Sequence, residues 1–350
     1  MINRKRFSKN FATYKKVRHW LQTKEKEADS GVAGISEARL DDYLRKWFSI
    51  YEPSIRGKTS IDYHRYIYKY LIPHIGEITL GNLSSLGIDQ YYRFLFTEAG
   101  KSASTIKHLH SVLHRALQYA VEKHILPNNP ADGATLPRHE KPEKKIWSLD
   151  EIRTFLNAAK LFPYEIVYYL AITTGMRQSE LFGLRWEDLD WDKETIHVQR
   201  QIVREKKGVW NFGPLKSKSA NRIIPLSKKT MEKLIIHRAY VNILPEISRG
   251  LWQENNLLLP TERGLPLYQG SIRTQMVKII NQENLPFITF HDLRHTTASL
   301  MINAGILIIE VSRLLGHSSI NVTLDTYTHF IPSMHNEKAN LIDDILNPID

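Results

Sequence analysis

Cysteine is absent from the 350-residue chain. Its absence excludes disulfide bridges, thiolate zinc sites, thiol nucleophiles and iron–sulfur clusters. Long apolar runs are absent too, because the longest apolar-rich stretch, residues 166–174, is half of the roughly 18 residues that a membrane helix needs. The basic N-terminus is not followed by the apolar segment of a secretory signal. We therefore expect a soluble cytoplasmic protein that has no membrane partner.

Acidic residues are outnumbered by basic ones. The chain contains 48 Lys and Arg against 37 Asp and Glu, which gives a formal net charge of +11. By charge alone, such an excess favours a polyanionic partner, either nucleic acid or an anionic membrane surface. Hydrophobic residues make up 42% and charged residues 24%, so the composition excludes wholesale disorder. At roughly 100–200 residues per domain, the length predicts two or three domains.

The first 30 residues are predicted to form a basic N-terminal arm. Residues 1–20 contain no acid, and aromatic residues such as Phe7 and Tyr14 interleave with their cations. A charge run of this kind is usually a solvated terminus, whereas aromatic rings among cations can lie along a nucleic-acid backbone. The clustered cations that we predict to contact DNA are Arg4, Lys5 and Arg6.

A helical DNA-binding domain is predicted over residues 35–137. Apolar residues from Leu40 to Tyr51 follow the spacing of one helix face, and three further helices follow them. The second helix is expected to end before Pro73, because proline disrupts a helix interior. The four predicted helices cover residues 40–51, 60–71, 87–99 and 104–124.

The last of these helices predicts a DNA-binding face. Its inward positions are apolar, while its other face carries Lys107 and Arg115, and Lys101 precedes it. We predict that these three cations bind DNA. The stretch that ends this block is rich in proline and charge, which is typical of a linker, and we place the linker at residues 138–145.

Residues 146–350 are predicted to form a second domain of mixed structure. Ser148 and Glu151 fit a capping box that opens its first helix. The apolar period later changes from helical to strand-like, and it is mostly helical again from residue 227. The predicted fold class is therefore mainly α with one small antiparallel β-sheet. Helices are expected over residues 148–160 and 164–173, and strands over residues 195–203 and 222–226.

Five segments of this second domain contain candidate functional residues. Each residue alone is more often structural, as a surface arginine, a packed histidine or a half-buried tyrosine. The signal is the ordered set, in which His291, Arg294 and His295 recur at i, i+3 and i+4 on one helix face. The candidates are Arg177 in TGMRQSEL, Lys216 in GPLKSKSANRIIPL, His291 and Arg294 in FHDLRHT, His317 in LLGHSS and Tyr327 in LDTYTHF.

This ordered set resembles the tyrosine recombinase (phage integrase) family, especially integrases of temperate phages and of conjugative elements of Gram-positive bacteria. The family pattern is an Arg in a TGxRxxE/D segment, a Lys on a β-hairpin, an H-x-x-R box, a His or Trp after LLG, and a Tyr nine or ten residues later. All six positions occur here in order, and Glu180 matches the acid of the first segment.

The resemblance implies the domain architecture. Residues 35–137 are similar to a helical SAM-like core-binding domain, and residues 146–350 are similar to the mixed α/β catalytic domain, with a C-terminal tail. Residues 1–30 resemble the end of a small arm-type DNA-binding domain. The chain departs from the pattern there, because only the last strand and helix of that domain are recognised.

The resemblance also implies the activity, a site-specific recombinase that cleaves and rejoins DNA through a covalent 3′-phosphotyrosine and so integrates or excises a mobile element. Two arginine forks can hold two phosphate oxygens without a metal or cofactor. Arg177 and Arg294 supply the forks, Tyr327 is the nucleophile and His291 its base. His317 would bond the phosphate. Lys216 would protonate the 5′-oxygen, with Lys218 as the alternative acid.

The implied partners are double-stranded DNA attachment sites, three further copies of the chain, and accessory DNA-bending or excision-directing proteins. The C-terminal tail is expected to link the copies of a homotetramer on DNA, or else to pack on its own domain. The apolar stripe of this tail consists of Leu341, Ile342, Ile345 and Leu346.

Three other interpretations remain. HDLRH is close to the H-E-x-x-H zinc pattern, with His317 as a third ligand, although Arg294 on the same helix face would place a guanidinium beside the metal. The second interpretation is a type IB topoisomerase, which uses a similar residue set to relax DNA. The third is a non-catalytic DNA-binding regulator, although such a protein would have no use for Tyr327.

Overall fold

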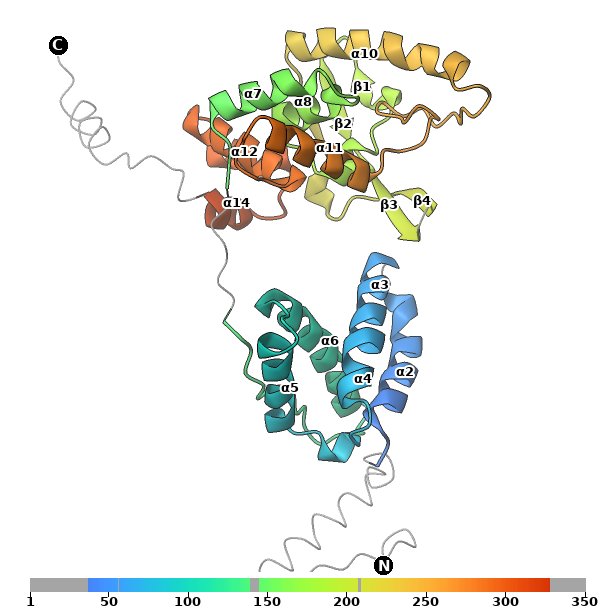
Figure 1. The fold of residues 1–350 in the computed structure, drawn as a ribbon, viewed down its shortest axis with the longest axis vertical. Coiled ribbons are helices and arrows are strands. Elements are labelled where there is room, and N and C mark those ends of the chain that lie inside the picture. The colour runs from blue at the N-terminus through green and yellow to red at the C-terminus, as the bar shows by residue number, and fades with distance from the viewer. Residues whose placement is uncertain (1–36, 56, 139–144, 207–208, 328–350) are drawn as a thin grey trace, which may run out of the picture. The chain divides into compact units, whose positions relative to one another are not determined.

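The computed structural model describes residues 37–55, 57–138, 145–206 and 209–327. The chain divides into two compact units, residues 1–142 and 143–350, each with its own hydrophobic core (Figure 1). Several predictions lie outside the described residues. They are those for Arg4, Lys5 and Arg6 in the arm, for the central part of the linker at residues 139–144, and for the tail from residue 328.

The described part of the N-terminal unit is helical (Figure 1). Its amphipathic helices bury their apolar faces in one core, where Trp47, Tyr92 and Leu113 are almost fully enclosed. Ser84 and Ser102 cap two of the helices through their hydroxyl groups. The helices are α2 (Leu40–Tyr51), α3 (Gly57–Arg65), a π-helical stretch (Tyr66–Leu71), α4 (Ile72–Ile75), α5 (Ser85–Thr97) and α6 (Ala103–Glu122), with short 3₁₀ turns at Glu52–Ser54 and Leu80–Asn82.

The prediction that the second helix ends before Pro73 is wrong. The chain stays helical through Pro73 to Ile75, because a π-helical stretch immediately precedes the proline. The N–H of Ile72 donates to the carbonyl of Ile67, five residues back, in place of the usual four. This shift of the hydrogen-bond register relieves the clash that a proline ring makes with the preceding turn of an α-helix.

The C-terminal unit places most of its helices around one large core (Figure 1). The predicted capping box opens α7, with the Ser148 hydroxyl accepting from the N–H of Glu151 and the Glu151 carboxylate accepting from the N–H of Ser148. The helices are α7 (Leu149–Ala159), α8 (Glu165–Thr174), α9 (Gln178–Leu181), α10 (Lys228–Ile247), α11 (Gln269–Gln282), α12 (Phe290–Asn303), α13 (Ile308–Leu315) and α14 (Ile320–Tyr327), with 3₁₀ turns at Trp186–Asp188 and Lys218–Ala220.

The strands form two antiparallel sheets in place of the single sheet that the sequence predicted. The predicted strand over residues 195–203 breaks at Gln199 and Arg200, whose side chains both bond to the carboxylate of Asp188. Its first half joins a three-stranded sheet in the order β1-β2-β5, and its second half forms a hairpin. The strands are β1 (Leu189–Asp190), β2 (Thr195–Val198), β3 (Gln201–Lys206), β4 (Val209–Gly213) and β5 (Arg222–Pro225).

The helix α12 packs closely against α8 and α13. The Thr297 hydroxyl of α12 donates to the carbonyl of Ile172 in α8, at 2.7 Å. Both neighbours end at a glycine in the left-handed region, α8 at Gly175 (φ 61°) and α13 at Gly316 (φ 68°). The carboxyl ends of two helices therefore meet beside α12, and the candidate site lies at this meeting point.

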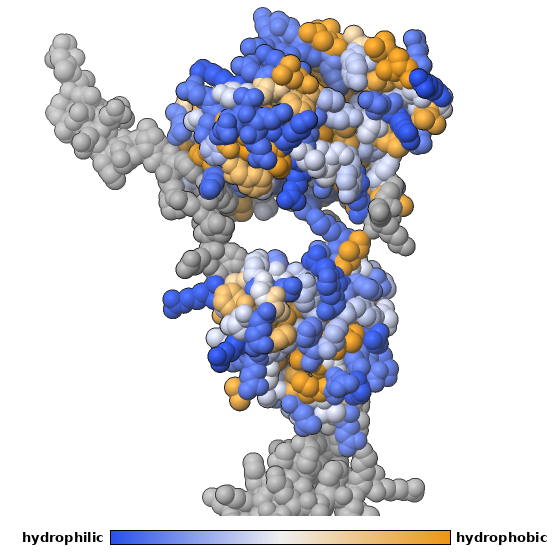
Figure 2. All heavy atoms as spheres, viewed as in Figure 1, coloured by the Kyte–Doolittle hydropathy of each residue, from blue (hydrophilic) through white to orange (hydrophobic). Residues whose placement is uncertain are grey.

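The helix α10 presents an apolar stripe to solvent. Figure 2 shows hydrophobic residues gathered over this helix, and Ile236 is 71% exposed. The other exposed members of the stripe are Ile235, Ile243 and Ile247. In the described part of the chain, no helix combines the length and the apolar character that crossing a membrane requires.

Candidate active site

Three consecutive carbonyl groups at the end of α13 each accept a hydrogen bond from a different arginine. The carbonyl of Leu314 accepts from Arg222 Nε at 2.5 Å and that of Leu315 from Arg294 Nη2 at 2.6 Å. The carbonyl of Gly316 accepts from Arg177 Nη2 at 3.0 Å. The last carbonyls of a helix lack partners within the helix and carry its negative dipole end. This end of α13 therefore gathers three guanidinium groups in one place.

In the described part of the chain, one carboxylate, that of Glu180, pairs with these arginines. It accepts from Arg177 Nη1 at 2.6 Å and from Arg222 Nη2 at 3.1 Å, and its side chain is 2% exposed. Burial opposes ionisation of this carboxyl, but Arg222 and Arg177 outweigh it and hold the pKa of Glu180 below its usual range. Glu180 is therefore an anion that holds two cations in place. It lies in the short helix α9, three residues after Arg177.

Arg294 is held by backbone carbonyls alone among the contacts described. Its Nη1 donates to Gly175 at 2.8 Å and its Nη2 to Leu315, and the residue is 3% exposed. No carboxylate of the described residues forms an ion pair with it. Burial, together with the like charge of Arg177, lowers the pKa of Arg294 to about 9. The guanidinium is still charged at neutral pH, so the cluster has positive charge to share with an added anion.

Both helix-ending glycines are required by space as well as by conformation. A Cβ on Gly175 would lie 2.6 Å from a methyl carbon of Leu315, and one on Gly316 would lie 2.9 Å from Arg222 Nη1. Both residues have positive φ, which L side chains rarely adopt. Substitution at either position would therefore move a carbonyl that holds an arginine.

Tyr327 lies at the end of α14, and its hydroxyl forms a hydrogen bond with His295. The Tyr327 Oη to His295 Nδ1 distance is 2.6 Å, and Tyr327 is 1% exposed. Burial raises the pKa of Tyr327 well above its ordinary value, and the charge of Arg294 acts in the opposite direction. The hydroxyl is therefore protonated at neutral pH, and it can donate to the imidazole nitrogen when that nitrogen carries no proton.

His317 follows α13 directly and is half-buried beside the arginines. Its Nδ1 lies 2.7 Å from the hydroxyl of Thr323, which is fully buried. Burial, followed by the charges of Arg294 and Arg177, lowers the pKa of His317 to about 3. The ring is therefore neutral at physiological pH. With Nδ1 accepting from Thr323, the proton is on Nε2, which becomes a neutral hydrogen-bond donor.

Both candidate lysines are exposed in the segment between β4 and β5. Lys216 follows the β3–β4 hairpin, whose last residue is Gly213, and Lys218 opens the 3₁₀ turn before β5. Neither lysine is held by an ion pair among the described residues. The choice between Lys216 and Lys218 therefore stays a prediction.

The fold brings most of the predicted residues together. Arg177, Arg294 and His317 share the end of α13, and the charges of both arginines act on the His317 ring. His291 lies at the edge of this group. Its side chain is exposed, and its ring packs edge-on against that of His295 with 5.0 Å between centroids.

Three residues of the site were not predicted from sequence. Arg222 was assigned only to a strand, although a cation two residues before the buried Ile224 lies on the same face of that strand. His295 was considered only as a zinc ligand in the alternative interpretation and was given no part in recombination. Thr323 was not singled out from the sequence, and it lies in α14, a helix that the sequence analysis did not predict.

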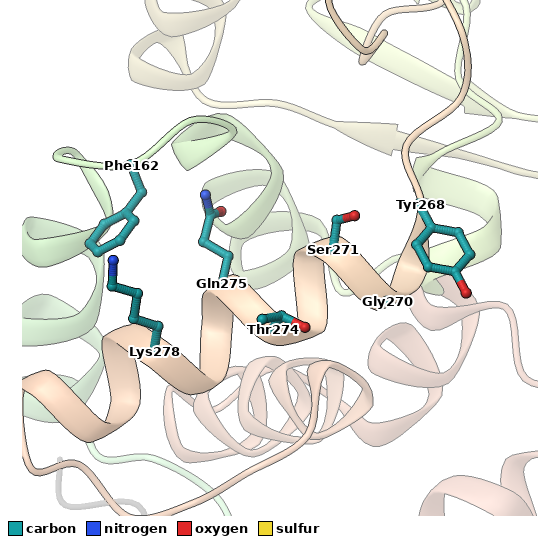
Figure 3. A pocket seen from close by; sticks show the side chains of 7 residues that line it. All are labelled: Phe162, Tyr268, Gly270, Ser271, Thr274, Gln275 and Lys278. Carbon is teal, nitrogen blue, oxygen red and sulfur yellow. The ribbon is translucent and has the colours of Figure 1, made fainter.

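The described cavities lie elsewhere. A cavity of about 580 Å³ is lined by residues of α11, by Tyr268 just before this helix and by Phe162 (Figure 3). Gln275 on this helix accepts from the Tyr168 hydroxyl, and Lys278 lies over the Phe162 ring, 5.3 Å from its centroid. The cavity contains none of the predicted catalytic residues.

The zinc interpretation requires His291, His295 and His317 to converge. His295 and His317 instead direct Nδ1 to Tyr327 and Thr323. Within the described ranges no three His, Asp or Glu side chains are grouped as a metal site requires.

The predicted DNA-binding residues of the N-terminal unit lie on or next to α6. Lys107 and Arg115 are exposed on this helix. Lys101 is partly buried, and its amine lies 5.9 Å from the centroid of the Tyr70 ring. Their contact with DNA stays a prediction.

Comparison with known proteins gives concordant results. The sequence model of the phage integrase family matches residues 146–333. A tyrosine recombinase XerC-like protein of Caldanaerobacter subterraneus subsp. tengcongensis is 28% identical over 365 residues, covering 95% of this chain and 91% of its own. The ICEBs1 integrase of Bacillus subtilis is 25% identical over 266 residues, covering 73% of this chain and 69% of its own.

Two solved structures have a similar fold. The integrase of transposon Tn1549, in complex with a circular intermediate DNA, matches with a TM-score of 0.74 and 18% identity, over 89% of this chain and all of that one. A lambda integrase tetramer bound to a Holliday junction matches with a TM-score of 0.62 and 21% identity, over 93% of this chain and 88% of that one.

Proposed function

Because the chain belongs to the phage integrase family and is a site-specific DNA recombinase, we propose that its arginine cluster holds the scissile phosphate while Tyr327 attacks it. The observation that carries this proposal is the shortage of negative charge at the end of α13. Among the described residues, one carboxylate, that of Glu180, pairs with two of the three guanidinium groups there, and Arg294 has only carbonyl partners. A phosphodiester is the anion of DNA that would complete the cluster.

The transition state of the cleavage step requires these cations. In-line attack adds negative charge to the equatorial oxygens of the phosphate, and an arginine that meets this charge in phosphoryl transfer contributes roughly 10³–10⁵ in rate. We assign this role to Arg177 and Arg294. Their positions are fixed in advance by carbonyl groups and by Glu180, so no reorganisation is needed when the charge develops.

The bond changes follow from the nucleophile. The Tyr327 oxygen bonds to the phosphorus, the bond to the 5′-oxygen breaks, and the DNA stays attached through a 3′-phosphotyrosine. Attack of a 5′-hydroxyl from another strand reverses these changes and rejoins the DNA. Lys216 would protonate the leaving 5′-oxygen, and the Nε2–H of His317 would donate to a phosphate oxygen. The tyrosine proton passes to the histidine pair of α12, in which the family pattern gives the role of base to His291.

The substrate and assembly are proposed on the same basis. We expect the protein to act on double-stranded attachment sites in the cytoplasm of a bacterial cell, and to integrate or excise a phage or conjugative element. The two units would both contact DNA, with Lys101, Lys107 and Arg115 binding the backbone. Four copies would assemble on DNA, since a lambda integrase of similar fold forms a tetramer bound to a Holliday junction. The C-terminal tail of this chain would link neighbouring copies. Accessory DNA-bending proteins would direct the reaction.

Covalent capture tests this function. The attachment site is sought in the DNA that flanks the gene, and a duplex of that site with a nick next to the cleavage position traps the intermediate, because the small fragment diffuses away. The wild-type chain should form an SDS-stable adduct with the DNA, in the presence of EDTA. Tyr327→Phe should bind the duplex with similar affinity and form none.

The opposite results are equally clear. No wild-type adduct on any flanking sequence would refute strand cleavage and leave a DNA-binding regulator. Relaxation of a supercoiled plasmid that lacks the attachment site would point to a type IB topoisomerase. An adduct that Tyr327→Phe still forms would assign the nucleophile to another residue.

A further inference from the structure

The hydroxyl of the nucleophile has one described hydrogen-bond partner, His295, and this residue has no role in the family pattern given above. His295 lies on α12 directly after Arg294, so the same turn of helix that fixes a phosphate-binding guanidinium also presents the imidazole. The 2.6 Å contact between Tyr327 Oη and His295 Nδ1 joins α12 to α14. Side chains of Ala298, Val311 and Leu315 enclose the tyrosine ring in a small apolar cluster.

The protonation states of Tyr327 and His295 decide which of them donates the hydrogen bond. The contact fits either group as the donor, depending on the tautomer of His295. In the tautomer with the imidazole proton on Nε2, the protonated Tyr327 hydroxyl donates and Nδ1 of His295 accepts. A phenol at neutral pH is about 0.1% ionised even when unperturbed, so attack on phosphorus requires an acceptor for its proton. A neutral imidazole within hydrogen-bond distance meets that requirement.

We infer that His295 is the catalytic residue that receives the Tyr327 proton during strand cleavage, an inference that rests on the proposed function. As the Oη–P bond forms and the P–O5′ bond breaks, the proton moves from Oη to Nδ1 and the imidazole becomes a cation. When a 5′-hydroxyl attacks the phosphotyrosine, the leaving Oη takes the same proton back. The protonation state of His295 is thus restored by each complete cycle, and no outside base is consumed.

The other groups of the site are less suited to this step. The pKa of His317 is lowered to about 3, so its ring is a poor proton acceptor, and its Nδ1 faces Thr323. Arg294 is a cation. His291 is exposed and lies behind His295, with its ring edge-on to the His295 ring. In this arrangement His291 acts through His295 and is a positioning residue.

The test separates proton acceptance from hydrogen bonding. Asparagine can place Oδ1 where the histidine Nδ1 lies, so His295→Asn keeps an acceptor for the Tyr327 hydroxyl but cannot take its proton. Adduct formation on the nicked attachment-site duplex is measured under single-turnover conditions, with binding of the same duplex measured in parallel. We expect His295→Asn to lose roughly 10²–10⁴-fold in rate, the range for a general base, with binding unchanged. His291→Asn is the matched control and should lose far less.

Two further readouts exclude a merely structural role. A substrate with a 5′-bridging sulfur leaving group needs no proton on that group, so it should not rescue His295→Asn. The wild-type rate should fall toward acidic pH, where a protonated imidazole cannot accept, and this fall should vanish in His295→Asn while remaining in His291→Asn. The charged and titratable groups described around the His295–Tyr327 contact include His291, Asp292, Arg294 and His317.

Each contrary result is informative. A wild-type rate in His295→Asn would refute proton acceptance by this residue. A loss confined to His291→Asn would return the role of base to His291. A faster rate in His295→Ala would mean that the contact only holds the tyrosine inactive. All three results require that the wild-type protein forms the adduct. If the proposed function itself is wrong, the wild-type protein forms no adduct, and this outcome differs from all three.

Discussion

Replacing Glu180 with glutamine should destabilise the C-terminal unit strongly, even though the change alters one atom. The Glu180 carboxylate is the only anionic side chain paired with Arg177 and Arg222 in the described part of the chain, and it is 2% exposed. A glutamine amide can accept from one of these arginines, but its NH₂ group then faces the other, donor against donor. The buried Arg222 and the partly buried Arg177 are then left without a counter-ion among the described residues.

The magnitude follows from the burial of this pair. Removing one partner of a buried, hydrogen-bonded ion pair costs roughly 3–5 kcal/mol of unfolding free energy. In a domain of about 200 residues each kcal/mol lowers Tm by about 2–4 °C, so the transition of this unit should move down by roughly 6–20 °C. Glu187→Gln is the control, since its carboxylate is 50% exposed and pairs with Arg200 and Arg185. That change should alter stability by less than about 1 kcal/mol.

Calorimetry of the full chain measures both variants, with pH and phosphate as the variables. The pKa of Glu180 is lower in the folded state, so its stabilisation is present above the unfolded value of about 4.3 and is lost as pH falls through the folded value. The gap between wild type and Glu180→Gln should therefore narrow in acid. Phosphate or sulfate should raise the Tm of Glu180→Gln more than that of the wild type. Equal Tm values at neutral pH, or no response to either anion, would refute the account of the cluster.

Two further predictions concern the proton donors of the site. Lys216→Ala should lose cleavage of ordinary DNA and recover it on a substrate with a 5′-bridging sulfur, because that leaving group needs no proton; recovery by Lys218→Ala alone would move the acid to Lys218. Thr323→Val removes the hydroxyl that orients His317 through the 2.7 Å contact while it keeps the volume of the side chain. It should slow adduct formation by roughly tenfold, the value of one hydrogen bond to a developing charge, with DNA affinity unchanged; an unchanged rate would show that the ring needs no orientation from Thr323.

The amino-acid sequence by itself determined the elements whose signals are local. Apolar periodicity predicted α2 and α6, and the capping box at Ser148 and Glu151 predicted the start of α7. The order of Arg, Lys, His, Arg, His and Tyr in the second half of the chain was sufficient to identify the family, and the family was confirmed by comparison. These features depend on neighbouring residues or on the order of residues, and both can be read directly from the amino-acid sequence.

The tertiary structure decided which groups meet. Nothing local to Arg222, Arg294 or Arg177 indicates that three successive carbonyls of α13 bind them, because those carbonyls lie between 21 and 139 residues away in the chain. The two lone pairs of each carbonyl are available only because a helix ends there, at a glycine that admits a left-handed turn.

The tertiary structure also decides which of the two histidines, His291 or His295, meets the nucleophile. His291 and His295 are one helical turn apart on α12 and are equivalent by spacing. Helix α14 packs on α13, and Tyr327 at its end reaches α12, where its hydroxyl meets His295 while His291 stays exposed to solvent. A four-residue spacing fixes a shared helix face, but only the position of a second helix decides which turn of that face it covers.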